Sequence, residues 1–424
     1  MKKHYDVAVI GGGTAGVVAA VQAARAGADT LLVERTGMLG GTVTNCNVHA
    51  PGLFYARHTQ VIRGIGWELV SETLELAGQQ MPDFCKPVAD PLNHKVQVPM
   101  NTALYALVCD KAVVSSGASV LLETSLAAIR EEKDGKHLTL CTREGLTEVS
   151  AAVVIDCTGD AAAVRMAGYG VEKGEELQPA TYSFTLSGYD RDALDLPALT
   201  AAADQAVAAG ELRYIDLGWK TYGADFRILR GHGENGNHID LPVCADTSEG
   251  KTAYDLEGRA AVLRAYRFLR KQKGLENLRL DALTPECGIR ETARIRGKKT
   301  VTCEDYLAGK RYGDDVCYTF YPIDLHCIKT DMRKVYPGEG VIPTIPRGAM
   351  LPEGSRNLLV AGRCVASDRE ANSAIRVECT AMAEGQAAGA LAYLAVTGGC
   401  DVEEVPMEKL YDLLEAHGAI VPRN

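Results

Sequence analysis

No two of the 13 cysteines stand in C-x-x-C spacing. That absence excludes three kinds of centre: a redox-active C-x-x-C disulfide, an iron–sulfur cluster held in the usual spacing, and a zinc ribbon. An odd number of cysteines cannot all pair within one chain, and so many of them indicate a reducing compartment. We therefore expect most cysteines to be small core residues. We also expect that the protein binds no metal and is cytoplasmic.

Positive charge and long apolar runs are also scarce. Lys and Arg number 45 against 55 Asp and Glu, which gives a formal net charge of −10. This balance argues against a nucleic-acid partner and gives no attraction to a membrane. No apolar segment reaches the roughly twenty residues that a membrane-spanning helix needs. The N-terminus resembles a secretory signal only faintly, because Asp6 and three successive glycines interrupt its apolar stretch.

The stretch from Asp6 to Gly41 has the pattern of a βαβ unit. Val7 to Ile10 predicts a buried strand, Ala15 to Ala26 a helix rich in small residues, and Thr30 to Val33 a second strand. With 424 residues, the chain has room for one or two further domains beside the one that this unit opens.

Three glycines stand where the first strand passes into the helix. Gly11, Gly13 and Gly16 have the G-x-G-x-x-G spacing, which serves a tight turn, close approach to a pyrophosphate, and packing of helix on strand. Glu34 follows the second strand, at the position where a carboxylate binds ribose hydroxyls. We expect a dinucleotide site; the alternative is a glycine turn without a ligand.

The residues around Glu34 also indicate which nucleotide binds. A carboxylate there favours a free ribose hydroxyl over a 2′-phosphate, which disfavours NADP. Glu34-Arg35, followed after four residues by Gly40-Gly41, resembles the two-glycine signature of FAD enzymes. In those enzymes the second loop lies along the pyrophosphate and the flavin, so the resemblance predicts FAD.

The next segments predict the rest of a sheet. We expect a helix over 101–116, followed by strands at 119–123, 127–131, 136–142, 147–150 and 152–155, the middle three forming an antiparallel meander. The segment from Asp156 to Ala161 then resembles the Ala-Thr-Gly-Asp loop at which FAD-binding domains of the two-dinucleotide superfamily return to the cofactor. This likeness assigns Thr158, Gly159 and Asp160 to the cofactor.

Residues 178–342 mix aromatic, charged and glycine residues without a long apolar run, and we interpret them as an inserted domain. Gly231 to Gly236 repeats the G-x-G-x-x-G spacing, but the residues that follow alternate and end at Pro242. Because no helix follows to receive a pyrophosphate, we reject this second motif and expect no separate NAD(P)H domain.

The C-terminal part predicts a buried strand at 357–363, a long small-residue helix at 376–395 and an amphipathic helix at 407–417. Gly389 would let the long helix pack closely on a neighbour. Ser373 to Arg376 precede that helix, so we expect its N–H groups and positive dipole end to stabilise negative charge on a reduced flavin, as the corresponding segment does in relatives.

Three further stretches resemble one family, the FAD-dependent oxidoreductases distantly related to fumarate reductase and succinate dehydrogenase flavoproteins. Gly288 to Gly297 is similar to the family's Gly-x-Arg-Glu-Ser/Thr-x-Arg-Ile motif, Tyr321 to His326 to its Tyr-x-Ile-Asp-x-His segment, and Leu358 to Gly389 to its ending. One departure is Ala293, which stands where an arginine is common. Together with the N-terminal matches, the likeness spans almost the whole chain.

The same stretches supply the catalytic candidates. If the Arg290 motif is helical, Arg290 and Arg294 lie four apart on one face and can clamp a carboxylate or another oxygen-rich group; the alternative is a structural salt bridge, such as one between Glu291 and an arginine from elsewhere in the chain. His326, beside Asp324, is a candidate general acid or base, with a core histidine as the alternative. We expect His326 to move the proton, Arg290 to position the substrate and Arg294 to support it.

One histidine raises the question of how the cofactor is attached. His49 lies in the segment where some succinate dehydrogenase relatives attach FAD covalently. Its surroundings, TNCNVHAPG, do not match the attachment motif. We therefore expect non-covalent FAD, with a covalent link through His49 as the alternative.

The predicted fold is α/β: a Rossmann-like FAD-binding domain of the GR2 type, residues 1–177 and 343–424, with an inserted α+β substrate or cap domain at 178–342. The predicted function is hydride transfer between flavin and a small polar organic substrate, a class that includes carboxylate-bearing compounds. The alternatives are an oxidase or monooxygenase that uses dioxygen, and an electron-transfer subunit; the substrate, the electron acceptor or donor and the oligomeric state stay open. The predicted cofactor contacts are Gly11, Gly13, Thr14, Ala15, Gly16, Glu34, Arg35, Gly40, Gly41, Thr42, Leu126, Thr158, Gly159, Asp160, Gly362, Arg363, Ser373, Ile375 and Arg376.

Overall fold

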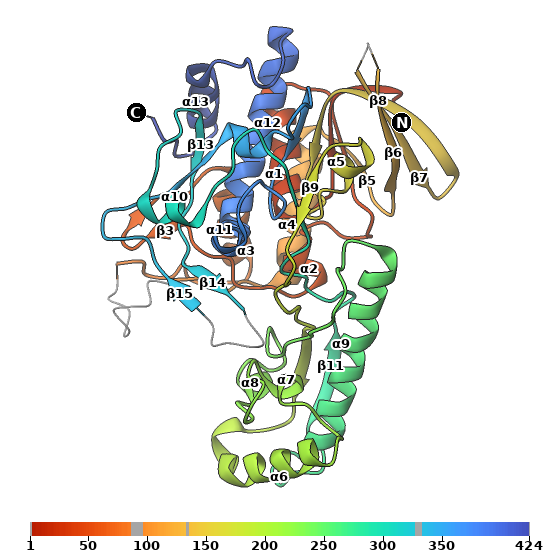
Figure 1. The fold of residues 1–424 in the computed structure, drawn as a ribbon, viewed down its shortest axis with the longest axis vertical. Helices are drawn as coiled ribbons and strands as arrows, with labels where there is room; N and C mark the ends of the chain where they lie inside the picture. The colour runs from red at the N-terminus through yellow and green to blue at the C-terminus, as the bar shows by residue number, and fades with distance from the viewer. Residues whose placement is uncertain (1, 86–95, 133–134, 327–332, 424) are drawn as a thin grey trace.

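The computed structural model describes residues 2–85, 96–132, 135–326 and 333–423. Figure 1 shows a broad main body, which carries both ends of the chain, and a narrower projection built from the middle of the sequence. None of the helices in the described ranges combines the length and hydrophobicity that crossing a bilayer requires.

The main body is organised around one sheet with strand order β5-β2-β1-β8-β7-β6, in which β17 also pairs with β8. β1 (His4–Ile10), β2 (Thr30–Val33) and β5 (Ser119–Leu121) are parallel neighbours within it, and β17 (Leu358–Val360) is parallel to its neighbour β8. The central residues of β1, β2 and β17 are apolar and buried, as expected for strands covered on both faces, whereas β5 at the edge is only partly buried.

β8 (Gly145–Asp156) belongs to two arrangements at once. Its first half pairs antiparallel with β7 (Gly135–Thr142), which pairs in turn with β6 (Ser125–Glu132), while its second half pairs parallel with β1 and β17. The predicted meander is therefore present, but the two strands expected at 147–150 and 152–155 form one continuous strand. Its carboxyl end lies beside that of β1, where the glycine loop begins.

Two helices pack backbone to backbone behind the sheet. α1 (Thr14–Ala26) lies against α12 (Glu378–Gly398), and small residues line the contact. A Cβ on Gly385 would stand 2.2 Å from the carbonyl oxygen of Ala15, and one on Gly389 would stand 2.4 Å from that of Ala19. The close packing predicted for Gly389 is confirmed.

The C-terminal helices differ from the prediction at one boundary. Instead of one helix from Arg376, α11 (Arg369–Ile375) ends first, Val377 is the N-cap of α12, and α12 continues to Gly398. α13 (Met407–Ala416) packs on α12 as predicted.

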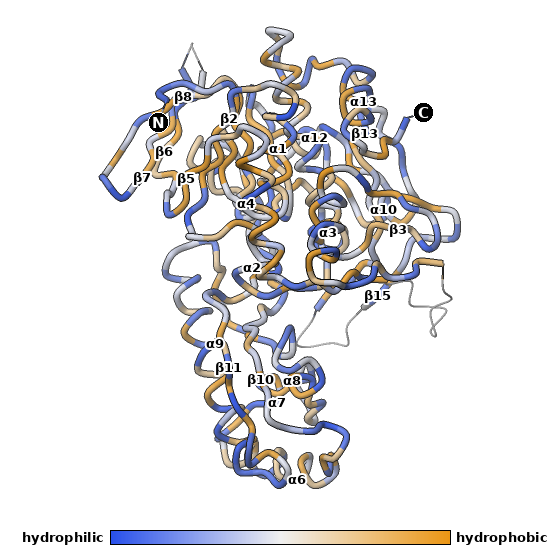
Figure 2. Tube along the Cα trace, turned by 180° about the vertical axis from the view of Figure 1, so that it is seen from behind, coloured by the Kyte–Doolittle hydropathy of each residue, from blue (hydrophilic) through white to orange (hydrophobic). Residues whose placement is uncertain are grey.

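The projection has a hydrophobic core of its own. Its buried cluster runs from Ala180 to Cys287, and we call residues 180–287 the insert. It contains β10 (Phe184–Ser187), α6 (Leu196–Ala208), α7 (Tyr214–Leu217), α8 (Arg227–Arg230), α9 (Ser248–Leu269) and β11 (Arg279–Leu283). Figure 2 shows orange, hydrophobic residues gathered around α1 and the sheet, with a further group along α9.

The segment after the insert packs on the main body. Ile295, Phe320 and Ile345 belong to the hydrophobic cluster that contains the sheet. We therefore propose that the inserted domain is shorter than residues 178–342 and ends near Cys287. The motif around Arg290 is also not helical, as the clamp hypothesis assumed: β12 (Ala293–Ile295) pairs with β9 (Val171–Lys173), which holds the segment extended.

The remaining elements surround this framework. They are α2 (Thr42–Asn45), β3 (Tyr55–Ala56), β4 (Thr59–Gln60), α3 (Ile65–Leu76), α4 (Thr102–Ser116), α5 (Ala162–Met166), a 3-10 turn (Arg191–Ala193), α10 (Cys303–Ala308), β13 (Asp315–Tyr318), β14 (Ile323–Leu325), β15 (Arg333–Val335), β16 (Thr344–Pro346) and a second 3-10 turn (Arg347–Met350). The residues after Gly236 form an isolated bridge through Ile239 rather than a helix, in agreement with the rejection of the second glycine motif.

The helix contact generates a stability prediction. Replacing Gly389 by Ala forces α12 away from α1, because the added Cβ meets backbone atoms that cannot rotate aside. We expect a loss of about 1–3 kcal/mol in the free energy of unfolding, the usual cost of overpacking. Chemical denaturation measures it. The matched control is Gly398→Ala at the end of the same helix, where the nearest atom to the added Cβ is Cys400 Sγ at 3.3 Å. Equal stability of the two variants would contradict the proposed contact.

Candidate active site

A cavity of about 720 Å³ runs along the carboxyl ends of β1, β2, β8 and β17 and continues under the insert. Its volume falls within the ~300–1,000 Å³ that ligand pockets usually have. Most of the predicted site residues line it: Gly11, Gly13, Thr14, Ala15, Glu34, Arg35, Gly41, Thr42, Leu126, Thr158, Gly159, Asp160, Arg290, His326, Gly362, Arg363 and Arg376. Five do not appear in its wall: Gly16, Gly40, Arg294, Ser373 and Ile375.

The loop between β1 and α1 can exist only with glycine at two positions. Gly11 has φ +103°, and a Cβ there would stand 2.5 Å from the Cys157 carbonyl oxygen. A Cβ on Gly16 would stand 1.7 Å from the Gly11 carbonyl oxygen, so Gly16 supports the loop without facing the cavity. Gly13 is the N-cap of α1 and has no side chain with which to cap it. The first N–H groups of α1 therefore point toward the cavity, which suits an anion such as a pyrophosphate.

Glu34 lies at the end of β2 with its carboxylate fixed by two backbone donors. Gly12 N–H donates to Oε2 at 2.6 Å and Thr36 N–H donates to Oε1 at 2.7 Å. The side chain is buried and lines the cavity. Each oxygen keeps a second lone pair, so the carboxylate can still accept hydrogen bonds from ribose hydroxyls.

The second glycine pair touches the first loop directly. Gly40 forms a bridge with Gly13, and a Cβ on Gly41 would stand 2.7 Å from the Gly13 Cα. Gly40 thus has a structural role, while Gly41 and Thr42 line the cavity at the start of α2. The two loops form one glycine-lined wall, which a ligand backbone can approach closely.

The loops after β8 and β17 are tied to each other. Arg363 donates from Nε to the Gly159 carbonyl oxygen at 2.9 Å and from Nη2 to the Asp160 carboxylate, which also accepts from Thr292 Oγ1 at 2.8 Å. Gly362 N–H donates to the buried Glu384 at 2.7 Å, and burial raises the pKa of that carboxyl well above its ordinary value. This end of the cavity is therefore preorganised by its own side chains.

Arg290 reaches the cavity from the segment before β12. Its Nη1 donates to the Pro179 carbonyl oxygen at 2.6 Å and its Nη2 donates to Asn235 Oδ1 at 3.0 Å. Burial, and then the positive charge of Arg376, lower the pKa of Arg290 to about 9, while Asp324 acts in the opposite direction. Arg376 is similarly affected: burial lowers its pKa, and Asp324 is the largest opposing influence.

Arg294 does not join Arg290 in a clamp. Its Nη1 donates to Glu291 Oε1 at 2.9 Å and its Nε donates to the Ser367 carbonyl oxygen at 3.0 Å. Glu291 also pairs with Arg369 at 3.5 Å. Two residues four apart share a face on a helix, but this segment is extended, and Arg294 turns into the core. The structural salt bridge considered as the alternative is the observed arrangement.

Ser373 and Ile375 are also placed differently from the prediction. They lie in α11, where the Ser373 hydroxyl accepts from Asp324 N–H at 2.9 Å and donates to the Glu370 carbonyl oxygen at 2.6 Å. Ile375 is fully buried in the core. The residues that face the cavity from the start of α12 are Val377 and Glu378.

His326 lines the cavity at the end of β14, and a second histidine stands beside it. The Nδ1 of His326 is 3.1 Å from the Nε2 of His238, which comes from the insert and is fully buried. Gln178 Oε1 accepts from both His326 N–H at 3.2 Å and Arg376 Nη2 at 3.3 Å. Sequence reasoning assigned no role to His238, Gln178 or Asn235, because no local pattern marks them.

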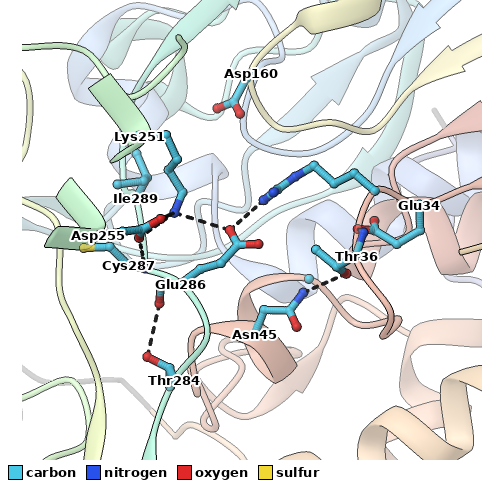
Figure 3. Close-up of polar contacts among 12 residues, drawn as sticks. Glu34, Thr36, Asn45, Asp160, Lys251, Asp255, Thr284, Glu286, Cys287 and Ile289 are labelled. Atoms are coloured by element: carbon cyan, nitrogen blue, oxygen red, sulfur yellow. Dashed lines mark hydrogen bonds and ion pairs between the residues drawn. The ribbon is translucent and has the colours of Figure 1, made fainter. Parts of the chain in front are cut away.

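The wall between the insert and the main body is held by a chain of ion pairs, shown in Figure 3. Arg35 pairs with Glu286 at 2.6 Å, Glu286 with Lys251 at 3.4 Å, and Lys251 with Asp255 at 2.7 Å. Asp255 then accepts from Cys287 N–H at 2.7 Å. Arg35, predicted only as a cofactor contact, also connects β2 to the insert.

His49 is absent from the cavity wall and pairs with Glu234, with 3.3 Å between Nδ1 and Oε2. The neighbouring residues Val48 and Ala50 do line the cavity. The described residues contain no group of three or more His, Cys, Asp or Glu side chains placed to hold a metal ion.

The arrangement fits FAD at three points. The uncapped start of α1 and the glycine wall suit a pyrophosphate, the fixed Glu34 carboxylate suits a ribose, and the far end, with Arg290, His326 and Arg376, suits the reactive ring and a substrate. The cavity connects these points continuously.

Comparisons with known proteins agree with this fit. The family model described as FAD dependent oxidoreductase matches residues 6–414. The dihydrolipoyl dehydrogenase of Trypanosoma brucei brucei is 47% identical over 55 residues, which are 13% of this chain and 12% of that protein. The leghemoglobin reductase of Vigna unguiculata is 38% identical over 81 residues, 17% of this chain and 15% of that protein. The match to these two relatives covers only a small part of their length.

Two solved structures align with nearly the whole chain. A geranylgeranyl bacteriochlorophyll reductase-like protein from Thermoplasma acidophilum covers 98% of this chain and 84% of its own, at 15% identity and a TM-score of 0.44. A myxobacterial chondrochloren halogenase covers 98% and 79%, at 12% identity and a TM-score of 0.47. From the family match over residues 6–414, together with the glycine loops and Glu34, we conclude that the chain belongs to the FAD-dependent oxidoreductase family.

Proposed function

We propose that this enzyme transfers a hydride between FAD and a small polar substrate that carries a carboxylate. The observation that supports it most directly is the meeting of Arg290, Arg376 and His326 at the end of the cavity that begins at the α1 loop. An oxidoreductase of this kind needs a group that binds the substrate and a group that moves a proton, and these side chains can provide both.

The charges at this end of the cavity favour an anionic substrate. Burial lowers the pKa of both guanidinium groups, Arg290 and Arg376, and the charge of Arg376 lowers that of Arg290 further, while Asp324 acts in the opposite direction on both. The Nε of Arg376 has no hydrogen-bond partner among the described residues. A substrate carboxylate would satisfy this donor and balance the second positive charge.

His326 is the candidate for moving the proton. Bound FAD would supply the hydride acceptor or donor, and a substrate hydroxyl or amine then needs a partner for its proton. An imidazole exchanges protons near neutral pH, and His326 lies in the same cavity wall as the two arginines. Two amide side chains position the groups at this end of the cavity. Asn235 accepts a hydrogen bond from Arg290, and Gln178 accepts hydrogen bonds from His326 N–H and from Arg376.

The residues proposed to hold FAD follow from the site geometry. The N–H groups of Gly13, Thr14 and Ala15 would bind the pyrophosphate, Glu34 the adenosine ribose, and the loops of Asp160 and Arg363 the ribityl side. His49, paired with Glu234 outside the cavity wall, has no part in this arrangement.

The first test concerns how FAD is held. We expect the purified protein to show flavin absorption, and the flavin to pass a filter after denaturation because His49, the candidate for a covalent link, lies outside the cavity wall. A His49→Ala variant should release its flavin in the same way as the wild type. Flavin that stays with the wild-type polypeptide but not with H49A would overturn non-covalent binding.

The second test concerns Arg290. Replacing it by Lys removes the fork that bonds both Pro179 and Asn235, so a substrate carboxylate loses a positioned partner. We expect the dissociation constant of a carboxylate ligand, read from the flavin spectrum, to rise about 10- to 100-fold, the size of one lost charge-assisted bond. Arg294→Lys is the matched control: it should lower stability while leaving ligand affinity unchanged. Equal losses of affinity in the two variants would contradict the assignment.

The third test concerns His326. Replacing it by Asn should leave FAD bound but slow flavin reduction by the substrate about 10²- to 10⁴-fold, the usual contribution of a general acid or base. Stopped-flow absorbance under anaerobic conditions measures the rate. His4→Asn, at an exposed position on β1, serves as the control for the substitution itself. An unchanged reduction rate in H326N would show that another group moves the proton.

A further inference from the structure

The arginines that line the cavity are of two kinds. Arg35 and Arg363 each pair with a carboxylate. Arg290 and Arg376, at the catalytic end, form no ion pair with any carboxylate in the described part of the chain. The two kinds therefore differ in the positive charge that they leave for a ligand.

Neutral oxygens hold Arg290 and Arg376 in place of carboxylates. Nη1 of Arg290 donates to the Pro179 carbonyl oxygen at 2.6 Å, and its Nη2 donates to Asn235 Oδ1 at 3.0 Å. Nη2 of Arg376 donates to Gln178 Oε1 at 3.3 Å. A guanidinium only donates hydrogen bonds, so each amide must present its oxygen to the arginine. These bonds orient the guanidinium groups without cancelling their charge.

Gln178 separates Arg376 from a carboxylate. Its buried Nε2 donates to Glu291 Oε2 at 3.4 Å, and its backbone N–H donates to the same oxygen at 3.2 Å. Glu291 also pairs with Arg294 and Arg369, which are both absent from the cavity wall. The amide thus stands between an anion and a cation, and the charge of Glu291 is balanced by arginines other than Arg376.

Asn235 reaches Arg290 from the loop Gly231–Gly236, the second glycine motif that was rejected above as a nucleotide site. Its φ of +41° is left-handed, a conformation that Asn adopts more readily than most residues. Its carbonyl oxygen accepts from Trp219 Nε1 at 3.1 Å, and its N–H donates to Ser183 Oγ at 3.3 Å. The side chain lines the cavity, and Nδ2 makes no hydrogen bond within the described ranges. The loop therefore holds one amide with its oxygen on Arg290 and with a donor left for a ligand.

The charges in this part of the cavity wall are not in balance. Asp324 lines the cavity too, but it is one carboxylate for two guanidinium groups and forms an ion pair with neither. Burial raises the pKa of Glu378, which favours its neutral form. A charge that is removed from water without a counter-ion is costly, and a bound anion would offset this cost. A neutral ligand of the same shape would leave it in place.

We propose that Asn235 is a positioning residue that determines specificity: it holds Arg290 through a neutral oxygen, so that the site selects a carboxylate substrate over the uncharged amide or ester of the same acid. The proposal rests on the carboxylate substrate proposed above. Gln178 holds Arg376 in the same way. A carboxylate in the place of Asn235 would itself balance Arg290 and remove the advantage of a charged ligand.

Exchanging the amide for a carboxylate tests the proposal with almost no change of shape. Asn235→Asp adds a negative charge beside Arg290, and it breaks no hydrogen bond that the structure describes, because Nδ2 makes none. The FAD-loaded protein is titrated at neutral pH with acetate and lactate, and with acetamide and lactamide, and the dissociation constants are read from the flavin spectrum. We expect the wild type to bind each acid more tightly than its amide, and N235D to lower this preference about 10- to 100-fold, the size of one charge-assisted bond.

Two further variants separate the charge from the contact. Asn235→Ala removes the acceptor without adding a charge, so we expect it to keep the preference for the acids. Asn277→Asp, at an exposed position of the same insert outside the cavity wall, adds the same charge elsewhere and should leave the dissociation constants unchanged. A loss of preference in N235A as large as that in N235D would show that the contact matters and the charge does not, which would overturn the proposal.

The outcomes separate this proposal from the function on which it rests. A wild-type protein that binds neither acid more tightly than its amide would show that the carboxylate substrate itself is wrong. A wild type that prefers the acids, together with an N235D variant that prefers them equally, would leave the substrate class standing and overturn the part played by Asn235.

Discussion

The structure depends on close contact between backbones around α1. Gly11 and Gly16 allow the turn into the helix, Gly41 allows the second loop to touch the first at Gly13, and Gly389 allows α12 to lie against the other side of α1. At each of these contacts a side chain would occupy space that backbone atoms already fill. Because α1 is held from both sides, its N-terminus is fixed at the edge of the sheet, and the cavity takes its shape from that point.

The parts of the site that a local pattern encodes could be predicted from the sequence. The strand, glycine loop, helix and Glu34 follow one another within a single βαβ unit, so their relative positions are set by that unit alone. The loop at Asp160 and the strand before Arg363 could also be predicted, since each continues a buried strand of the same sheet. The strand bounds shifted by a few residues, and β8 turned out to be one strand.

The catalytic end could be predicted only in part, because distant segments build it. The hypothesis that paired Arg290 with Arg294 assumed a helix, but pairing with β9 extends the segment and turns Arg294 toward Glu291 and Ser367. Ser373 was placed at a helix start, yet it lies inside α11 and binds Asp324. His238 had no pattern at all to mark it. It contacts His326 across 88 residues, and spacing along the chain does not reveal such a contact.

The late position of β17 in the chain has a consequence for how the protein folds. β17 pairs with β8 at residues 154–156, and its own residues are 358–360, so the whole insert must be synthesised before the sheet is complete. α12, which covers the glycine-lined side of α1, follows later still. Until then the edge of β8 and the apolar surface of α1 remain uncovered on the ribosome, and exposed strand edges and apolar surfaces of this kind promote aggregation. Chaperone protection during translation is therefore most needed between the emergence of β8 and that of α12.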